Sequence, residues 1–188
     1  MKYKILKCFS SEECELIIKD FEKNKNNFKI SKEHGVKRIS SYEIDIKNLS
    51  EDISNLIYDR CEKNIRKLTG GKFGMIFGIK YSLDTKPGMS YHYDCNSYSC
   101  VIKLNDDYNG GGTIFPLSNK IINLESVGDG LLFKSDTIKS YHGANPITSG
   151  VRYVLSVRIE KKNMLNFLLK AFILSKIDFF IRKFYKNI

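Results

Sequence analysis

The chain has 188 residues, 42% of them hydrophobic, and a formal net charge of +10. This length fits one domain that buries roughly 70% of its unfolded surface, and the apolar content excludes an intrinsically disordered protein. The charge fits an acidic partner such as nucleic acid, a membrane surface or an acidic peptide, although lysines spread so widely along the chain also fit a general drift of composition.

The five cysteines and the first residues bear on the cellular compartment. The cysteines form no C-x-x-C pair of the kind that binds zinc, and residues 1–7 lack the long apolar stretch of a secretory signal. We therefore expect an intracellular, cytoplasmic protein whose thiols are reduced.

Residues 1–72 predict an N-terminal support region of the same domain, built around two helices. Ser10 is followed three residues later by Glu13, which is the spacing of a capping box at the start of a helix. The expected apolar stripe of this helix consists of Leu16, Ile17 and Phe21.

A second helix is predicted over about 51–68, with Ser50 as its N-terminal cap. Between the two helices, residues 24–37 are polar and irregular, and we expect His34 in this stretch to be exposed to solvent. A strand over 38–46 follows, because polar and apolar residues alternate near its end.

Residues 73–160 predict a core of short strands separated by turns, a pattern typical of a jelly roll. The expected fold is mainly β with flanking helices (α+β): a double-stranded β-helix, or jelly roll, with N-terminal helices and a C-terminal helix. Helices packed on one face of such a sandwich would brace a site inside it. Strands are expected at 73–81 and 97–104 and near Ile114, Ile121, Leu131 and Tyr153, with a turn over 106–112.

A metal-binding pattern lies at His92-Tyr93-Asp94. Residues i and i+2 of a strand point to the same face, so the imidazole of His92 and the carboxylate of Asp94 would point toward one spot. Together they supply two thirds of a 2-His-1-carboxylate triad, which holds Fe(II) and leaves coordination positions open. The third ligand has to be a histidine, and the chain has two others, His34 and His142.

The surroundings of His142 favour it as the third ligand. A turn signal over 145–150 separates it from Arg152, so the chain should reverse there and bring Arg152 back toward His142. An arginine beside a metal with open positions suits a carboxylate-bearing cosubstrate, because a guanidinium donates two parallel hydrogen bonds to a carboxylate.

Four motifs follow one another along the chain: His92-x-Asp94, Leu104-Asn105 to Gly112-Thr113-x-Phe115, Gly128-Asp129-x-Leu131-x-Phe133, and His142-Gly143 to Gly150-x-Arg152-Tyr153. In this order they resemble the 2-oxoglutarate- and Fe(II)-dependent dioxygenases, in the branch of the prolyl and lysyl hydroxylases. The Asp-Tyr-x-Gly-Gly-Gly run and the arginine resemble the catalytic domain of procollagen lysyl hydroxylases in particular. The branch often has a glycine two residues after the distal histidine, whereas here the glycine follows the histidine at once.

The resemblance implies the ligands and the cosubstrates. Fe(II) would be bound by His92, Asp94 and His142, which with Arg152 make the catalytic set. Dioxygen and 2-oxoglutarate would be cosubstrates, with ascorbate as a reductant. An aspartate at position 94 argues for hydroxylation, because related halogenases leave that position open for chloride.

The resemblance also implies which residues hold 2-oxoglutarate. Its far carboxylate would pair with Arg152, and the hydroxyl of Tyr81 would be a second donor. A threonine would add a contact, and Thr148 and Thr113 are the two candidates, of which we take Thr148 as the expected one.

The expected reaction is hydroxylation of an unactivated C–H bond in a lysyl or prolyl side chain of a peptide or protein. One alternative is a dioxygenase that acts on nucleic acid or a small molecule. The other is a non-catalytic protein that kept the fold, against which the intact metal ligands and arginine argue.

Residues 161–188 form an apolar, basic tail that predicts a C-terminal helix. A bilayer span needs about 20 uninterrupted apolar residues, and four charged residues interrupt this stretch. We expect the helix to dock on the domain or on a second copy in a homodimer; the alternative is contact with a membrane surface by residues 163–188. The interrupting residues are Lys170, Lys176, Asp178 and Arg182.

Overall fold

Two antiparallel sheets enclose a cavity in the computed structural model, which describes residues 2–32, 40–94, 96–160, 173 and 176. The expectations for His34, for Cys95 and for a C-terminal helix lie outside these residues, apart from Ile173 and Lys176 in the last case. Within the described part of the chain, no helix is long and apolar enough to cross a membrane.

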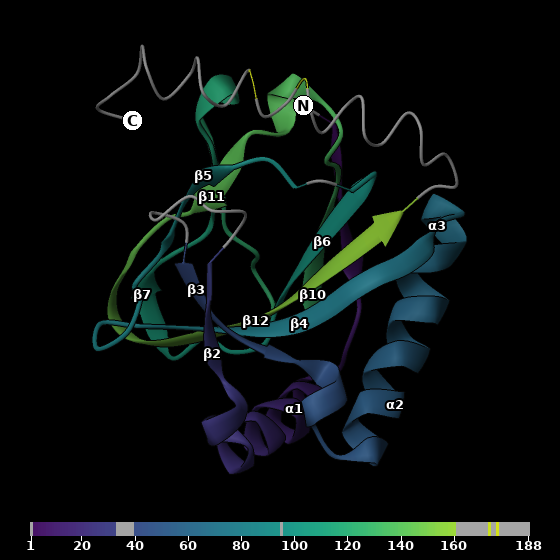
Figure 1. Ribbon diagram of the computed structural model, residues 1–188, viewed down its shortest axis with the longest axis vertical. Coiled ribbons are helices and arrows are strands. Elements are labelled where there is room, and N and C mark those ends of the chain that lie inside the picture. The colour runs from purple at the N-terminus through teal and green to yellow at the C-terminus, as the bar shows by residue number, and fades with distance from the viewer. Residues whose placement is uncertain (1, 33–39, 95, 161–172, 174–175, 177–188) are drawn as a thin grey trace.

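The larger sheet runs in the order β1-β10-β6-β12-β4-β3-β2, and β7 pairs with β12 outside this path (Figure 1). The central strand of this sheet is β12, which has 14 residues and pairs with β4 on one side and β6 on the other. The strands are β1 (Tyr3–Lys7), β2 (Lys29–Lys32), β3 (Ser40–Asp45), β4 (Lys72–Ser82), β6 (Tyr98–Lys103), β7 (Tyr108–Gly110), β10 (Asp129–Lys134) and β12 (Ile147–Glu160).

The smaller sheet has the order β5-β11-β8-β9. Its strands are short, so it depends on the larger sheet for most of its burial. They are β5 (Met89–His92), β8 (Thr113–Phe115), β9 (Lys120–Ile122) and β11 (His142–Ala144).

The helices lie together against the larger sheet, away from β5 and β11 (Figure 1). α1 spans Ser11–Lys23 and α2 spans Glu51–Cys61, which continues through a π-helical turn, Glu62–Arg66, into α3, Lys67–Thr69. Short 3-10 turns complete the description at Lys25–Asn27, Ile46–Asn48, Pro116–Ser118 and Ile138–Ser140.

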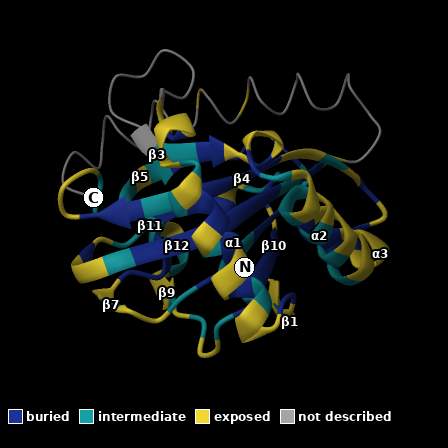
Figure 2. Cartoon of the chain, turned by 90° about the horizontal axis from the view of Figure 1, so that it is seen from below, coloured by how far each residue is buried: buried dark blue, intermediate teal, exposed yellow. Residues whose placement is uncertain are grey.

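The two-residue period of β12 separates the apolar core from the cavity. From Arg152 onward, its odd-numbered positions are buried in the cluster that contains the helices, whereas its even-numbered positions line the cavity on the other face. The strand is therefore buried along most of its length (Figure 2). The core-facing residues are Tyr153, Leu155, Val157 and Ile159, and the cavity-facing residues are Arg152, Val154, Ser156 and Arg158.

The predicted start of α1 is confirmed, but its apolar stripe is partly wrong. Ser10 Oγ accepts a hydrogen bond from the Glu13 amide, and the Glu13 carboxylate accepts one from the Ser10 amide. Leu16 is 52% exposed, and fully buried Cys14 takes its place beside Ile17. Cys14 lies three positions before Ile17, on the face that meets the sheet.

The N-terminal half also differs from expectation in two local features. Ser50 makes no side-chain cap at the start of α2; instead its amide donates to Asp20 Oδ2 at 2.8 Å, so a residue of α1 caps α2. The polar stretch 24–37 is not wholly irregular, because β2 lies within it and pairs with β3. The cysteines Cys8, Cys14, Cys61 and Cys100 are buried free thiols.

Candidate active site

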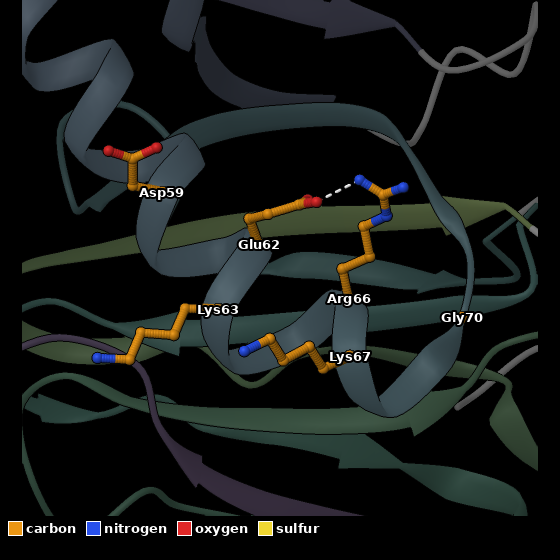
Figure 3. A pocket seen from close by; sticks show the side chains of 6 residues that line it. All are labelled: Asp59, Glu62, Lys63, Arg66, Lys67 and Gly70. Atoms are coloured by element: carbon orange, nitrogen blue, oxygen red, sulfur yellow. Dashed lines mark hydrogen bonds and ion pairs between the residues drawn. The ribbon is translucent and has the colours of Figure 1, made fainter.

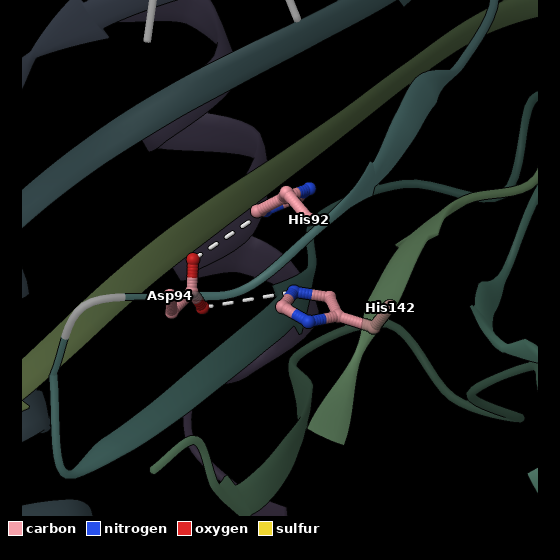
Figure 4. A group of neighbouring side chains, drawn as sticks. All are labelled: His92, Asp94 and His142. Atoms are coloured by element: carbon pink, nitrogen blue, oxygen red, sulfur yellow. Dashed lines mark ion pairs between the residues drawn. The ribbon is translucent and has the colours of Figure 1, made fainter. Parts of the chain in front are cut away.

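The two histidines of the predicted triad lie directly opposite each other in the smaller sheet. His92 ends β5, His142 begins β11, and the two are paired in register with ring centroids 4.5 Å apart. Asp94 follows β5 by two residues, and all three side chains are at least 95% buried. Figure 4 shows them converging on one point.

The distances among the three side chains suit a bound cation. Asp94 Oδ1 lies 3.4 Å from His92 Nε2, and Asp94 Oδ2 lies 3.6 Å from His142 Nε2. One potential ligand atom from each residue lies within 4.8 Å of the others. The three residues could therefore hold one metal ion, which the sequence pattern predicted.

Hydrogen bonds to the backbone fix the tautomer of both histidines. Nδ1 of His92 lies 2.9 Å from the carbonyl oxygen of Ser90, and Nδ1 of His142 lies 2.8 Å from that of Ser140. A carbonyl oxygen only accepts, so Nδ1 carries a proton in each ring, and in the neutral ring Nε2 presents a lone pair. Second partners of this kind orient histidine ligands in metal sites.

The charge states of the site also fit a metal. Burial lowers the pKa of His142 to about 4, so its ring is neutral at neutral pH. Burial opposes ionisation of Asp94, but Arg158 and the two histidines outweigh it and hold the pKa of this carboxyl well below its ordinary value. Two neutral imidazoles and one carboxylate are the donor set of Fe(II) sites with open positions.

Two side chains beside Asp94 were not singled out from the sequence. Ser99 Oγ donates a hydrogen bond to Asp94 Oδ2, and Arg158 Nη2 lies 3.3 Å from Oδ1. Ser99 belongs to β6 and Arg158 to β12, so neither is near Asp94 in an obvious sequence motif. The alternation of β12 was the available signal, since Arg158 lies six residues after Arg152 and must share its face.

Arg152 is a buried cation that faces the same cavity. It is 5% exposed, and among the described residues its Nε and Nη1 have no hydrogen-bond partner. Its guanidinium carbon lies 5.1 Å from the ring centroid of Tyr81 and 5.9 Å from that of Tyr108. Unpaired buried donors are costly, so this guanidinium is suited to an anion that enters the cavity.

Tyr81 and Thr113 line the cavity with Arg152, whereas Thr148 does not. Burial raises the pKa of Tyr81 to about 12, so its hydroxyl keeps its proton and can donate. Thr148 is exposed and does not line the cavity, so the geometry favours Thr113 over Thr148 as a cosubstrate contact. The alternation counted from Arg152 does not extend to this end of β12, because the pairing with β7 shifts register between Ile147 and Ser149. Ile147, and not Thr148, is therefore buried with Tyr81 and Val154.

The expected turns around the site are shorter than the sequence suggested. Of the turn expected over 145–150, only residues 145–146 separate β11 from β12, because residues 147–150 already belong to β12 and pair with β7. β7 itself lies within residues 106–112, where the sequence predicted another turn. The reversal still places His142 and Arg152 on one cavity. Asn105 secures this end of β12, because its side chain donates to Val151 O and accepts from the Tyr153 amide.

A second hollow lies on the outer face of the α2–α3 segment (Figure 3). Its lining residues are all exposed and carry charges of both signs, including an ion pair between Glu62 and Arg66. Such an arrangement is typical of a solvated helix surface. The buried cavity between the sheets is the stronger candidate site.

Comparisons with known proteins agree with this geometry. No family model matches the sequence. A procollagen lysyl hydroxylase and glycosyltransferase of Acanthamoeba polyphaga mimivirus is 32% identical over 84 residues, which is 43% of this chain and only 9% of that relative.

Solved structures match over most of the chain. A viral collagen prolyl hydroxylase from Paramecium bursaria Chlorella virus-1, in complex with 2-oxoglutarate, aligns with a TM-score of 0.63 at 17% identity and covers 85% of this chain and 96% of that one. This chain has the prolyl hydroxylase fold. A prolyl-4-hydroxylase of Pseudomonas putida, with a TM-score of 0.54 and 12% identity, covers 86% and 93% of the two chains.

The prolyl hydroxylase fold confirms two predictions made from sequence. The jelly-roll class with N-terminal helices is correct, and so is the resemblance based on four motifs. The displaced glycine after the distal histidine also has a structural reason here. A Cβ at Gly143 would lie 2.6 Å from the carbonyl oxygen of Met89, so β5 and β11 approach too closely for a side chain.

Proposed function

We propose that this chain is a 2-oxoglutarate- and Fe(II)-dependent dioxygenase that hydroxylates an unactivated C–H bond. The observation that carries the proposal is the buried guanidinium of Arg152, whose unpaired donors face the cavity that also holds His92, Asp94 and His142. A metal site alone would fit many reactions. A metal site with an anion-binding arginine fits a cosubstrate that carries a carboxylate.

The three ligand residues are oriented and charged for metal binding before a metal ion enters the site. Each Nδ1 donates to a backbone carbonyl, which leaves Nε2 of His92 and His142 to bind the metal, and Asp94 supplies the negative charge. When bound, Fe(II) would supply the oxidative chemistry on dioxygen and 2-oxoglutarate. The protein orients the groups and excludes water.

Arg152 and its neighbours would hold the far carboxylate of 2-oxoglutarate. Arg152 would donate two hydrogen bonds, and the hydroxyls of Tyr81 and Thr113 are further donors on the cavity wall. Apolar side chains that line the same cavity, Ile79 and Val154 among them, would help to exclude water and so strengthen these charged contacts.

For the substrate, we propose a prolyl or lysyl side chain in a peptide or protein. The names of the similar proteins support this choice, since one is a procollagen lysyl hydroxylase and another a collagen prolyl hydroxylase. The chain spans less than a tenth of the length of the lysyl hydroxylase relative, so the substrate of this chain is our proposal.

The test is a turnover assay with peptides. Purified protein, Fe(II), ascorbate, 2-oxoglutarate and dioxygen are incubated with proline-containing peptides, lysine-containing peptides or a single-stranded oligonucleotide. We expect a peptide to accelerate succinate release and to gain one oxygen atom by mass spectrometry. Stimulation by the oligonucleotide alone would replace the peptide proposal with the nucleic-acid alternative.

A variant of one metal ligand, compared with a matched control, tests the assignment of the three ligands. His142→Ala should abolish both Fe(II) binding and succinate release, because removing a ligand should cost more than the roughly 10–100-fold that loss of an outer partner costs. His34→Ala removes the other candidate histidine and should leave both unchanged. Full activity of His142→Ala would exclude the triad.

A further inference from the structure

The two carboxylate oxygens of Asp94 have different surroundings. Ser99 and Arg158 are directly paired across β6 and β12, and the carboxylate lies against both. Ser99 Oγ donates a hydrogen bond to Oδ2, whereas Arg158 Nη2 lies 3.3 Å from Oδ1 in an ion pair. Oδ1 is buried but accepts no hydrogen bond from the described residues.

A chain of buried hydrogen bonds orients the Ser99 hydroxyl. Asn96 Nδ2 donates to Ser99 Oγ at 3.1 Å, and Ser135 Oγ lies 2.7 Å from Ser99 Oγ. A serine hydroxyl has one proton to donate, and Ser99 gives it to Asp94. Ser99, Asn96 and Ser135 are all at least 95% buried, so water does not compete for these bonds.

We propose that Ser99 is a positioning residue that reserves Oδ2, so that Asp94 binds the metal through Oδ1 alone. The inference rests on the metal site of the proposed function. A carboxylate can bind a cation through one oxygen or both. Because Oδ2 is already engaged by Ser99, it is withheld from the metal, and the coordination position that it would take stays open for a cosubstrate.

The inference predicts a specific defect when the hydroxyl is removed. In Ser99→Ala, Oδ2 is free to join the metal, and the carboxylate takes up a position that 2-oxoglutarate needs. The variant should still bind Co(II), used as a spectroscopic substitute for Fe(II). Its affinity for 2-oxoglutarate should fall by roughly 10–100-fold, the usual cost of losing an outer partner of a metal ligand.

The experiment uses the full chain loaded with Co(II), without turnover. The visible absorption spectrum reports the coordination of the metal, and calorimetry gives the affinity of the loaded protein for 2-oxoglutarate. Ser135→Ala is the graded comparison: it breaks the same buried chain one step away from the carboxylate and leaves the Ser99 donor in place, so its defect should be smaller. Ser99→Cys keeps a side chain of similar size with a weak donor and should show the same defect in smaller degree.

The comparison of the variants with wild type supports or overturns the role of Ser99. A changed spectrum and weakened 2-oxoglutarate binding in Ser99→Ala, with a smaller change in Ser135→Ala, support the role of Ser99. If Ser99→Ala does not fold, the same comparison is made with Ser99→Cys. A Ser99→Ala variant that matches wild type, or a Ser135→Ala variant with an equal defect, overturns the inference alone. Failure of the wild-type protein to bind Co(II) overturns the proposed function with it.

Discussion

Tyr81 and Arg152 are directly paired across β4 and β12, and the guanidinium of Arg152 lies 5.1 Å from the centre of the Tyr81 ring. Both belong to the larger sheet, whereas the two histidine ligands belong to the smaller one. The candidate site is therefore completed only when the two sheets pack together. Variants that shift one sheet relative to the other should affect cosubstrate binding and metal binding to different extents.

Gly111 is expected to control the position of Arg152. It has φ of +78°, and a Cβ there would lie 3.2 Å from Arg152 Cδ and 3.0 Å from the Tyr108 ring. Gly111→Ala should cost about 1–2 kcal/mol of stability from left-handed strain. It should also weaken 2-oxoglutarate binding to the metal-loaded protein, measured by calorimetry.

Gly70→Ala is the control for backbone strain. Gly70 has φ of +63°, but a Cβ there would meet nothing within 4 Å. The variant should lose a similar amount of stability and keep wild-type affinity for 2-oxoglutarate. Equal affinities in the two variants would contradict the role of Gly111 in placing Arg152.

The two threonines named from the sequence should behave differently. Thr113 is buried on the cavity wall and Thr148 is exposed outside it. Thr113→Val should raise the 2-oxoglutarate concentration needed for half-maximal succinate release by up to about tenfold, because a typical hydrogen bond contributes roughly 0.5–1.5 kcal/mol. Thr148→Val should not change it, and the reverse result would restore the original choice of Thr148.

The sequence predicted those parts of the site that depend on local spacing. The separation of His92 from Asp94 by one residue is enough to place both on one side of an extended segment, and the turn before β12 returns Arg152 to the cavity. Ser99 and Arg158 could not be assigned in this way. Their role depends on the register between β6 and β12, which local sequence does not encode.

The errors in the fold have the same physical origin. The stretch that contains β7 predicted a turn because Asn109 and Gly110 follow two aspartates, yet β7 pairs with β12 once that strand is in place. Short strands owe their existence to cross-strand partners more than to intrinsic preference. Leu16 was assigned to the core from periodicity, but the sheet meets α1 along a line through Cys14 and Ile17.

Glu22 is expected to make stability depend on pH in the acid range. Its carboxylate accepts a hydrogen bond from Tyr153 at 2.6 Å and pairs with Lys80 at 2.9 Å, which joins α1 to the sheet. Burial opposes ionisation, but Lys80 and Tyr153 outweigh it, so the pKa of Glu22 lies below its ordinary value of 4.5. Its stabilising contribution is therefore complete above pH 4.5 and is lost as the pH falls through the folded-state pKa.

Chemical unfolding at several pH values tests this contribution. Glu22→Gln should lower the free energy of unfolding at pH 7 by up to about 1 kcal/mol, since the pair is partly exposed. The difference from wild type should shrink as the pH is lowered below 4.5. Glu15→Gln, on the exposed face of the same helix, is the matched substitution and should leave the free energy of unfolding at pH 7 unchanged. A constant deficit for Glu22→Gln across this range would count against the charge as its cause.

The most direct test of the account is an anaerobic titration of the protein with Fe(II) and then 2-oxoglutarate, followed by visible absorption. We predict that a metal-to-ligand charge-transfer band appears in the wild-type protein. In Arg152→Ala, Fe(II) should still bind, but the band should require much more 2-oxoglutarate, because losing a buried charged partner costs on the order of 2–5 kcal/mol. A folded protein that gives no band, or an Arg152→Ala variant with unchanged 2-oxoglutarate affinity, would contradict the assignment of this cavity to an iron- and 2-oxoglutarate-dependent enzyme.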